Sequence, residues 1–451
     1  MVSLATISAI RFGYGPAGRG VPRDAEAHLD RLKRGDRIAR RYPAPGLDDA
    51  ISLGQKYRAA QRAAQDGTSG DQRAELRRAL LRSFGGALVA SFARIAETDD
   101  PLRERLVWFW ADHFTATPKN VLLRAVAGDY IDSAIRPHVT GRFADMLMAV
   151  ITHPMMLVYL DQVASVGPGS RAGKRRGLGL NENLAREVME LHTLGVAGPY
   201  RQADVRALAE LFTGLTVSPD RGFVFRPILA EPGAETVLGK TYGGQRAKLE
   251  DIRAVVEDLA RHPATAEHVS AKLATHFVAD RPDPDLVAAM VAAWQGSDGD
   301  LAEVTAAMLR HPAAWVAEFG KARQPMDYLA ASIVALGIDG QTLSGLKDRE
   351  VLLLLARPLR VMGQPFMQAP GPDGWPEAAD HWITPQGLAA RIAWSVEAAR
   401  RVAERGMDPR AFVTRALGDA AGDRLKWAVG AAETRAEGLA LVLASAEFNR
   451  R

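Results

Sequence analysis

Apolar residues recur at helical spacing along most of this chain. A period of three to four residues is that of a helix with one face against a core. The segments with this period are 48–97 with a break at 67–70, 102–114, 120–135, 142–151, 155–160, 181–194, 202–213, 249–260, 264–278, 284–294, 301–309, 389–405 and 434–444. We therefore expect a mainly α protein with a multi-helix globular fold.

Two local signals sharpen this picture near the N-terminus. The turn Gly67–Gly70 predicts that 48–97 forms two long helices that lie antiparallel. Asp100 followed by Pro101 predicts the start of the next helix, because proline at the first helical position forfeits no hydrogen bond. That helix carries a dense aromatic cluster, which we expect to anchor the core: Trp108, Phe109, Trp110 and Phe114.

The helical period is interrupted by one strand-like stretch. Between Leu215 and Gly244, β-branched and aromatic residues alternate around the turns 219–222 and 231–233. This pattern predicts a small β-hairpin or flap near 215–244. It divides the chain into an N-terminal helical region (1–100), core helices (101–214), a β insertion (215–247) and a C-terminal helical region (248–451).

The C-terminal region contains a loop at 362–382 that is rich in glycine, proline and tryptophan. Ordered loops of this composition cover clefts or domain seams. A further stripe, His268, Lys272 and His276, occupies one face of the helix at 264–278. It could contact an anion or carry a ligand, and a half-exposed helix face would explain it equally well.

Composition excludes several classes of protein. The 451 residues include 57 basic and 53 acidic ones, and a net charge of +4 is small for a nucleic-acid binder, so no nucleic-acid partner is expected. The chain has no cysteine, which excludes disulfides and thiolate-bound metals. No stretch approaches about 18 uninterrupted apolar residues, so no membrane span is expected. The first residues lack a signal-peptide pattern, which favours a cytoplasmic location, with co-export to the periplasm beside a partner as the alternative.

Three hydrophobic helices are predicted to end in a histidine followed by proline. The pairs are His153-Pro154, His262-Pro263 and His311-Pro312. Proline pushes the preceding residue out of the α region, so histidine at this position is a turn residue first and a ligand second.

The most chemically loaded segment is the predicted helix Asn181–Gly195. At about 100° per residue its polar residues share an arc of about 140°; they are Glu182, Asn183, Arg186, Glu187 and Glu190. His192 falls on the opposite, apolar side. The glycine at position 195 is the expected C-terminal stop.

Two interpretations fit this helix. As an acid/base site, Glu182, Arg186, Glu187 and Glu190 would work with an imidazole, either His113 or His153 from another helix or His192 of this one. As a cation site, Glu187 and Glu190 would join His153 around a divalent ion. The other interpretation is structural: the charges form a solvated or buried network of ion pairs, and His192 is a core residue bonded to a carbonyl.

A glycine-rich basic loop, 167–179, precedes the acidic helix. Arg171, Lys174 and Arg175 could bind an anion at the helix start, where backbone N–H groups favour negative charge. The alternative is a flexible linker that pairs with Glu182.

Several long motifs resemble one bacterial family. They are Arg105–Trp110 with His113-Phe114, His153-Pro154 with Tyr159–Asp161, Asn181–Glu187 with Glu190–Gly195, His262–Ala266, Met362–Pro365, Gly374–Pro376 and Ser445–Phe448. This set resembles the family named domain of unknown function 1800. The resemblance implies a mostly helical fold without an assigned activity. It also implies a candidate partner from the domain of unknown function 1501 family, which resembles sulfatases and is commonly exported.

The alternative to an enzyme is therefore a non-catalytic interaction or maturation partner of such a neighbour. The chain departs from the family pattern at Ala197 and at Ala230-Glu231, where relatives often carry an acidic residue and a His-Asp pair. Any role of those positions in binding is in doubt here.

Overall fold

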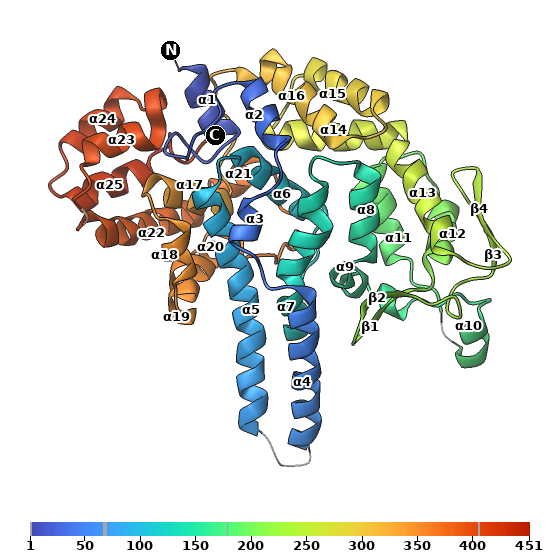
Figure 1. Ribbon diagram of the computed structural model, residues 1–451. Coiled ribbons are helices and arrows are strands. Elements are labelled where there is room, and N and C mark those ends of the chain that lie inside the picture. The colour runs from blue at the N-terminus through green and yellow to red at the C-terminus, as the bar shows by residue number, and fades with distance from the viewer. Residues whose placement is uncertain (1, 66–69, 178, 405) are drawn as a thin grey trace.

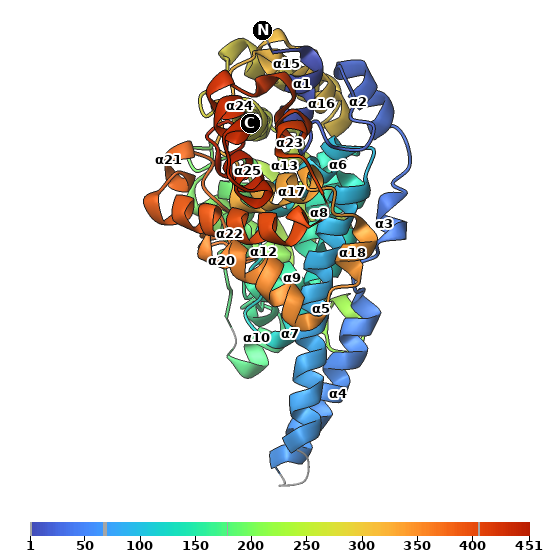
Figure 2. The same cartoon turned by 90° about the vertical axis from the view of Figure 1, so that its left-hand side faces the viewer.

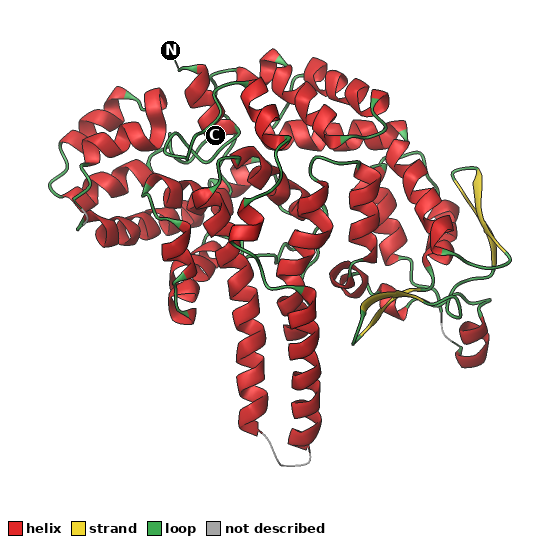
Figure 3. Cartoon of the chain, viewed as in Figure 1, coloured by secondary structure: helices red, strands yellow, loops and turns green. Residues whose placement is uncertain are grey.

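The computed structural model describes residues 2–65, 70–177, 179–404 and 406–451. Helices make up nearly all of it, and the strands lie at one margin (Figure 3). The expectation of a mainly α protein with a small β insertion is confirmed.

The N-terminal part of the chain supplies helices of the body and one projecting pair. Its helices are α1 (Leu4–Arg11), α2 (Ala25–Leu32), α3 (Ile38–Arg41), α4 (Leu47–Gln65), α5 (Gly70–Glu97), α6 (Pro101–His113) and α7 (Val121–Asp129). The helices α4 and α5 are antiparallel, as expected, and project from the body in both views (Figures 1 and 2). The predicted turn between them falls at 66–69, outside the described residues.

One helix in the described residues, Asp71–Glu97 within α5, has the length and composition of a membrane-crossing segment. Half of its apolar window is buried inside the protein, as in the core helix of a globular fold. Figure 1 shows its C-terminal end entering the body beside α6 and α18 (Gly340–Ser344).

The middle of the chain is a succession of short helices and turns. They are a π-helical turn at Tyr130–Ile135, α8 (Phe143–Thr152), α9 (Pro154–Tyr159), α10 (Arg171–Arg176), α11 (Asn183–Glu187), a second π-helical turn at Val188–Thr193, and α12 (Gln202–Phe212). Each His-Pro turn caps a helix. The Nδ1 atoms of His153, His262 and His311 accept the backbone N–H two residues on, at 3.1, 3.1 and 3.3 Å.

The β insertion is two hairpins instead of the single hairpin or flap expected. Strand β1 (Leu215–Ser218) pairs with β2 (Gly222–Phe225), and β3 (Gly233–Val237) pairs with β4 (Lys240–Gly244), both antiparallel. The two pairs belong to separate sheets. The turn around Pro232 separates them, because proline cannot donate to a strand ladder.

The C-terminal half is again helical. Its helices are α13 (Leu249–Arg261), α14 (Pro263–Phe277), α15 (Pro284–Gly296), α16 (Leu301–Arg310), α17 (Pro325–Ala335), α18, α19 (Asp348–Val351), α20 (Arg357–Val361), α21 (Ala379–Trp382), α22 (Pro385–Ala403), α23 (Pro409–Leu417), α24 (Asp423–Gly430) and α25 (Arg435–Ala444). The long loop between α20 and α21 is the predicted Gly/Pro/Trp-rich segment. A third π-helical turn, Leu352–Ala356, precedes α20.

One hydrophobic cluster runs through the body from Phe12 to Phe448. The aromatic residues of α6 lie at its centre as expected: Trp110 is 1% exposed and its ring lies 5.9 Å from that of Phe114. Around this core, helices that are distant in sequence come together, and charged side chains are trapped between them.

Candidate functional site

One group of buried charged residues lies where α6, α14, α17 and the loop 362–378 converge. The helix α6 contributes Arg105 and Asp112, and α14 contributes Lys272 and His276. Two adjoining cavities lie at this junction. We name them the Arg451 cavity and the Lys272 cavity after the cation that lines each.

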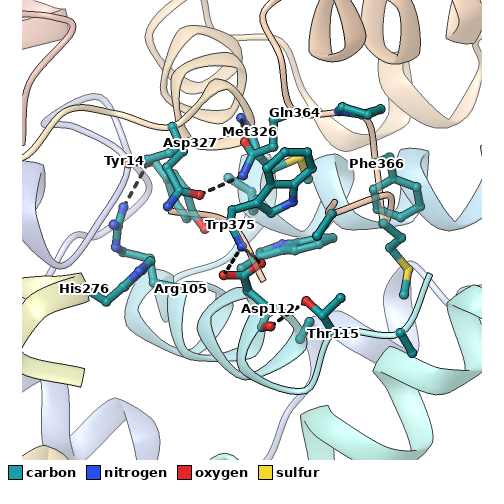
Figure 4. Close-up of a pocket in the computed structure, with 18 of the residues that line it drawn as sticks. Tyr14, Arg105, Asp112, Thr115, His276, Met326, Asp327, Gln364, Phe366 and Trp375 are labelled. Atoms are coloured by element: carbon teal, nitrogen blue, oxygen red, sulfur yellow. Dashed lines mark hydrogen bonds and ion pairs between the residues drawn. The ribbon is translucent and has the colours of Figure 1, made fainter. Parts of the chain in front are cut away.

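The Arg451 cavity has a volume of about 90 Å³. Figure 4 shows Asp112 and Thr115 on one side of it, Met326 and Asp327 across from them, and Trp375 between. Its apolar walls come from large side chains, namely Trp108, Met326, Phe366, Met367 and Trp375. Its polar end is formed by Tyr14, Arg105, His276, Gln324, Asp327 and Arg451.

Asp327 is the centre of a buried charge cluster. Its carboxylate lies 3.0 Å from Arg105 Nη1, 3.4 Å from Arg323 Nη1 and 2.9 Å from Arg451 Nε. All four side chains are nearly buried, with Arg323 and Arg451 only 1% exposed. Burial raises the pKa of Asp327, and the three arginines more than offset this and lower it to about 2. The carboxyl is therefore ionised at neutral pH.

This cluster carries more positive than negative charge. Among the described residues, three guanidinium groups surround the carboxylate of Asp327, and Glu377 is the other carboxylate that acts on Arg451. Burial lowers the pKa of Arg451 to about 10, which leaves it protonated at neutral pH. Buried charges without partners are costly, so the surplus requires an explanation.

Several donors of the cluster also lack an acceptor. Within the described part of the chain, Arg105 Nε, Arg451 Nη1 and Gln324 Nε2 are buried and have no hydrogen-bond partner. Arg451 Nε is close to Asp327 Oδ2, but that ion pair does not have the angles of a hydrogen bond. All three residues line the Arg451 cavity.

Asp112 separates the two cavities and is fixed by the loop 362–378. The backbone N–H of Trp375 donates to both of its carboxylate oxygens, at 3.0 and 3.2 Å. Gly374 permits this approach: it has φ +84°, and a Cβ there would lie 2.8 Å from Asp112 O and Oδ2. Burial and the nearby Glu377 raise the pKa of Asp112 to about 7. The carboxyl is thus poised to give or take a proton near neutral pH.

A second fixed pair continues the wall between the cavities. His276 Nδ1 lies 2.6 Å from Glu377 Oε1, and Lys321 Nζ lies 2.9 Å from Glu377 Oε2 and 2.7 Å from Asp280. Burial lowers the pKa of His276 to about 4. Burial would raise the pKa of Glu377, but His276, Lys321 and Arg451 hold it well below its usual range. The loop 362–378 is therefore tied to α14 by the hydrogen bond between His276 and Glu377.

The acidic helix lies apart from the Arg451 cavity and is half-buried. Arg186 bonds to Glu182 and to Glu190, both at 3.2 Å, and Gln202 bonds to Glu182 at 2.8 Å. These contacts are the i,i+4 pairs of the structural interpretation. Partial burial and the neighbouring Glu190 raise the pKa of Glu187 to about 7. Asp373 of the loop 362–378 contributes in the same direction.

The second half of that helix is not a regular α-helix. Residues 188–193 form a π-helical turn, closed by the bond from Leu194 N to Met189 O at 2.9 Å. The arc drawn at 100° per residue therefore holds only up to Glu187. Such turns recur at functional sites, and here the turn places His192 in the core with 0% exposure.

Among the described residues, neither His113 nor His192 bonds to a carboxylate of the acidic helix. His113 Nε2 lies 3.2 Å from the carbonyl of His192, and His113 lines the Lys272 cavity. Both ring nitrogens of His192 are buried without a partner among the described residues. Burial lowers the pKa of His192 to about 3 and that of His113 well below its usual value, so both rings are neutral.

His153 is occupied elsewhere and does not meet Glu187 and Glu190. Its Nδ1 caps α9, and its Nε2 lies 3.0 Å from Asp129. Neither nitrogen is free for a metal ion. Across the residues that the structure describes, no group of three or more His, Asp or Glu side chains is arranged to hold one.

The basic loop is a short capped helix instead of a flexible linker over its described residues. Ser170 caps α10, on which Arg171, Lys174 and Arg175 lie, all at exposed positions. The backbone N–H of Gly169 already donates to Glu231 Oε2 at 2.7 Å. A carboxylate of the chain therefore lies at the glycine-rich turn that begins α10. Leu178 lies outside the described residues.

Sequence reasoning found part of the central site. It singled out Lys272, His276 and the loop 362–382, which do line the cavities. It missed Asp327 and Arg451 and gave no role to Arg105 beyond a motif. No sequence signal links these three, since Arg105 and Asp327 are 222 positions apart.

The fold and this junction define a class of protein: a mainly helical globular protein with an enclosed cavity lined by arginine and aromatic side chains. The chain belongs to the domain of unknown function 1800 family (DUF1800, protein of unknown function), whose model matches residues 8–450. The resemblance noted in its motifs is confirmed. No curated protein and no solved structure matches the chain.

Proposed function

We propose that this protein binds a small organic anion in the Arg451 cavity and acts on it by acid/base chemistry at Asp112. The observation that carries the proposal is the pair of buried guanidinium nitrogens, Arg105 Nε and Arg451 Nη1, that have no acceptor in the described residues. An anionic group placed between them would supply the missing acceptor. It would also offset the surplus charge around Asp327.

The rest of the cavity suits the remainder of such a molecule. Trp108, Phe366 and Met326 present apolar surface opposite the charged end. Pockets of this kind bind ligands through an apolar body with a few polar anchors. The expected ligand is thus a small carboxylate or phosphate ester with an apolar portion.

Asp112 would supply the chemistry. Its carboxyl lines the same cavity, and its pKa of about 7 makes both protonation states accessible near neutral pH. The N–H of Trp375 orients it. This arrangement supports proton transfer to or from a bound anion.

Thermal unfolding in the presence of a panel of small aliphatic and aromatic carboxylates and phosphate esters tests the binding step. We expect at least one compound to raise the melting temperature and to bind by calorimetry. The substitution Arg451→Met should abolish that binding, while Arg310→Met, which removes an exposed guanidinium paired with Glu26, should not. Equal binding by wild type and Arg451→Met would refute the proposal.

A second candidate is the acidic helix, favoured by the raised pKa of Glu187. Glu187 and Glu190 would share a cation or a proton. Asp373 also raises the pKa of Glu187 and is the further carboxylate that could take part. Elemental analysis of purified protein, repeated on Glu187→Gln and Glu190→Gln, tests the cation version. A wild-type chain free of stoichiometric metal would end it.

A non-catalytic role as an interaction partner is the alternative to both. It predicts a stoichiometric complex with a protein of the domain of unknown function 1501 family and no ligand from the panel. Co-expression followed by size-exclusion chromatography distinguishes this outcome. Co-export to the periplasm would be expected only if such a complex forms.

A further inference from the structure

The Lys272 cavity, about 200 Å³ in volume, lies beyond the wall formed by Asp112 and Trp375. Lys272 projects from α14 and lines it. No carboxylate of the described residues lies within ion-pair distance of its Nζ. Lys321, by contrast, is held by Asp280 and Glu377 at 2.7 and 2.9 Å.

Two opposing effects act on the pKa of Lys272. Burial lowers the pKa of Lys272, and the carboxylates of Asp112, Glu377 and Asp373 act against this. The net direction is downward. A lysine of this kind, enclosed and without a fixed partner, has more free amine at neutral pH than an exposed one.

Two histidines provide bases in the same cavity. The Nε2 atoms of His113 and His268 each lie 3.2 Å from a backbone carbonyl, of His192 and Leu191 respectively. A carbonyl only accepts, so Nε2 carries the proton in each ring. Burial lowers the pKa of both rings, which keeps them neutral and leaves Nδ1 with a lone pair. His113 Nδ1 is buried without a partner in the described chain.

We propose that Lys272 is a reactive amine that condenses with the carbonyl group of a small neutral aldehyde or ketone in this cavity. The amine lone pair attacks the carbonyl carbon and forms a C–N bond. The carbonyl oxygen then leaves as water with both amine protons, and a C=N bond remains. No oxidant or further reactant is required.

The charges of the cavity select the class of carbonyl compound. Asp112, Asp373 and Glu377 line it, and Lys272 is the one lysine among the described residues that line it. The carboxylates of Asp373 and Glu377 repel an anionic compound such as a 2-oxo acid, and Asp112 adds to this repulsion in its ionised form. A neutral aldehyde is therefore preferred here, whereas the Arg451 cavity is suited to anions.

Reductive labelling tests this inference directly. The folded wild-type chain is incubated at pH 7 with propanal and cyanoborohydride, which traps an imine as a stable secondary amine, and labelled lysines are located by peptide mass spectrometry. We expect Lys272 to be labelled on the order of tenfold faster than exposed Lys347, since each unit by which a pKa is lowered gives up to about tenfold more free amine. Buried and paired Lys321 should remain unlabelled.

Two comparisons complete the test. Pyruvate in place of propanal should label Lys272 more slowly, because of the surrounding carboxylates. Binding of the anion panel is measured separately on the unlabelled wild-type chain, so failure of the anion proposal and failure of this one are distinguishable. Labelling of Lys272 no faster than that of Lys347 in the wild-type chain overturns the inference.

Discussion

The backbone N–H of Trp375 bonds to both carboxylate oxygens of Asp112, across 263 positions of sequence. This contact joins the loop 362–378 to the last turn of α6. It places one carboxylic acid with a pKa near 7 in the wall between two cavities. The position of the acid therefore depends on the conformation of the loop.

The raised pKa of Asp112 predicts a specific pH dependence of stability. Burial raises this pKa from 3.8 to about 7, so between those values the folded chain holds a proton that the unfolded chain has released. Its contribution to stability is full below about pH 4 and is lost as pH rises through 7. In Asp112→Asn the free energy of unfolding should fall less steeply with rising pH, by up to about 1.4 kcal/mol per pH unit.

Urea denaturation at several pH values from 4.5 to 8 measures this slope. The exposed residue Asp423 provides the control, because Asp423→Asn should leave the slope unchanged. Identical slopes for wild type and Asp112→Asn would show that the carboxyl does not hold a proton in the folded state.

The cluster around Asp327 predicts unequal effects of removing opposite charges. Asp327→Asn leaves three buried guanidinium groups without a carboxylate and should cost about 3–5 kcal/mol. Arg451→Met removes one surplus charge and retains an apolar chain of similar length, so the loss should be below about 2 kcal/mol. Chemical denaturation of both variants at pH 7 checks the difference. Equal losses would contradict the surplus of positive charge.

Two glycines in the same loop separate crowding from backbone strain. Gly374 and Gly363 have φ values of +84° and +97°, and a side chain is disfavoured at both. A Cβ at Gly363 meets nothing within 4 Å, while one at Gly374 collides with Asp112. We expect Gly363→Ala to cost about 1–2 kcal/mol and Gly374→Ala clearly more.

Only Gly374→Ala should also displace Asp112. The loss of stability between about pH 4 and pH 7 that Asp112 causes should therefore disappear in Gly374→Ala and remain in Gly363→Ala. Matching pH profiles for the two variants would argue against the contact.

The half-buried Glu187 predicts a smaller loss of stability with rising pH, in the same direction as that predicted for Asp112. Its pKa is raised from 4.5 to about 7, so its contribution to stability is present below about pH 4.5 and is lost as pH rises through 7. The free energy of unfolding of Glu187→Gln, relative to that of wild type, should be higher at pH 8 than at pH 5. The change should be less than about 1 kcal/mol because solvent screens the site. Glu190→Gln instead breaks an ion pair with Arg186 and should lose a few tenths of a kcal/mol at pH 5, where Glu187 is protonated and Glu190 does not repel it.

The His-Pro turns predict a graded cost of losing a helix cap. His311→Ala removes one cap and should cost about 1 kcal/mol. His153→Ala removes a cap and also the partner of Asp129, so about 2–3 kcal/mol is expected. Thermal unfolding of the two variants compares them, and equal costs would indicate that the contact with Asp129 contributes nothing.

The helices of this protein could be predicted because their signals are local. The start of α6 follows from Asp100 and Pro101, and the end of the acidic helix follows from Gly195, which has φ +84°. The π-helical turn at Val188–Thr193 could not be predicted in this way. Its bonds depend on how the helix packs, and its sequence is that of an ordinary amphipathic helix.

The helical class, the caps and the family follow from the amino-acid sequence, because each depends on neighbouring residues or on long continuous motifs. The site follows from the packing of helices that are distant in sequence. Arg105, Asp112, Asp327 and Arg451 each resemble an ordinary surface charge within their own segment. They become a buried, unevenly charged cavity because packing of the hydrophobic core brings distant helices together and excludes water from the charges between them.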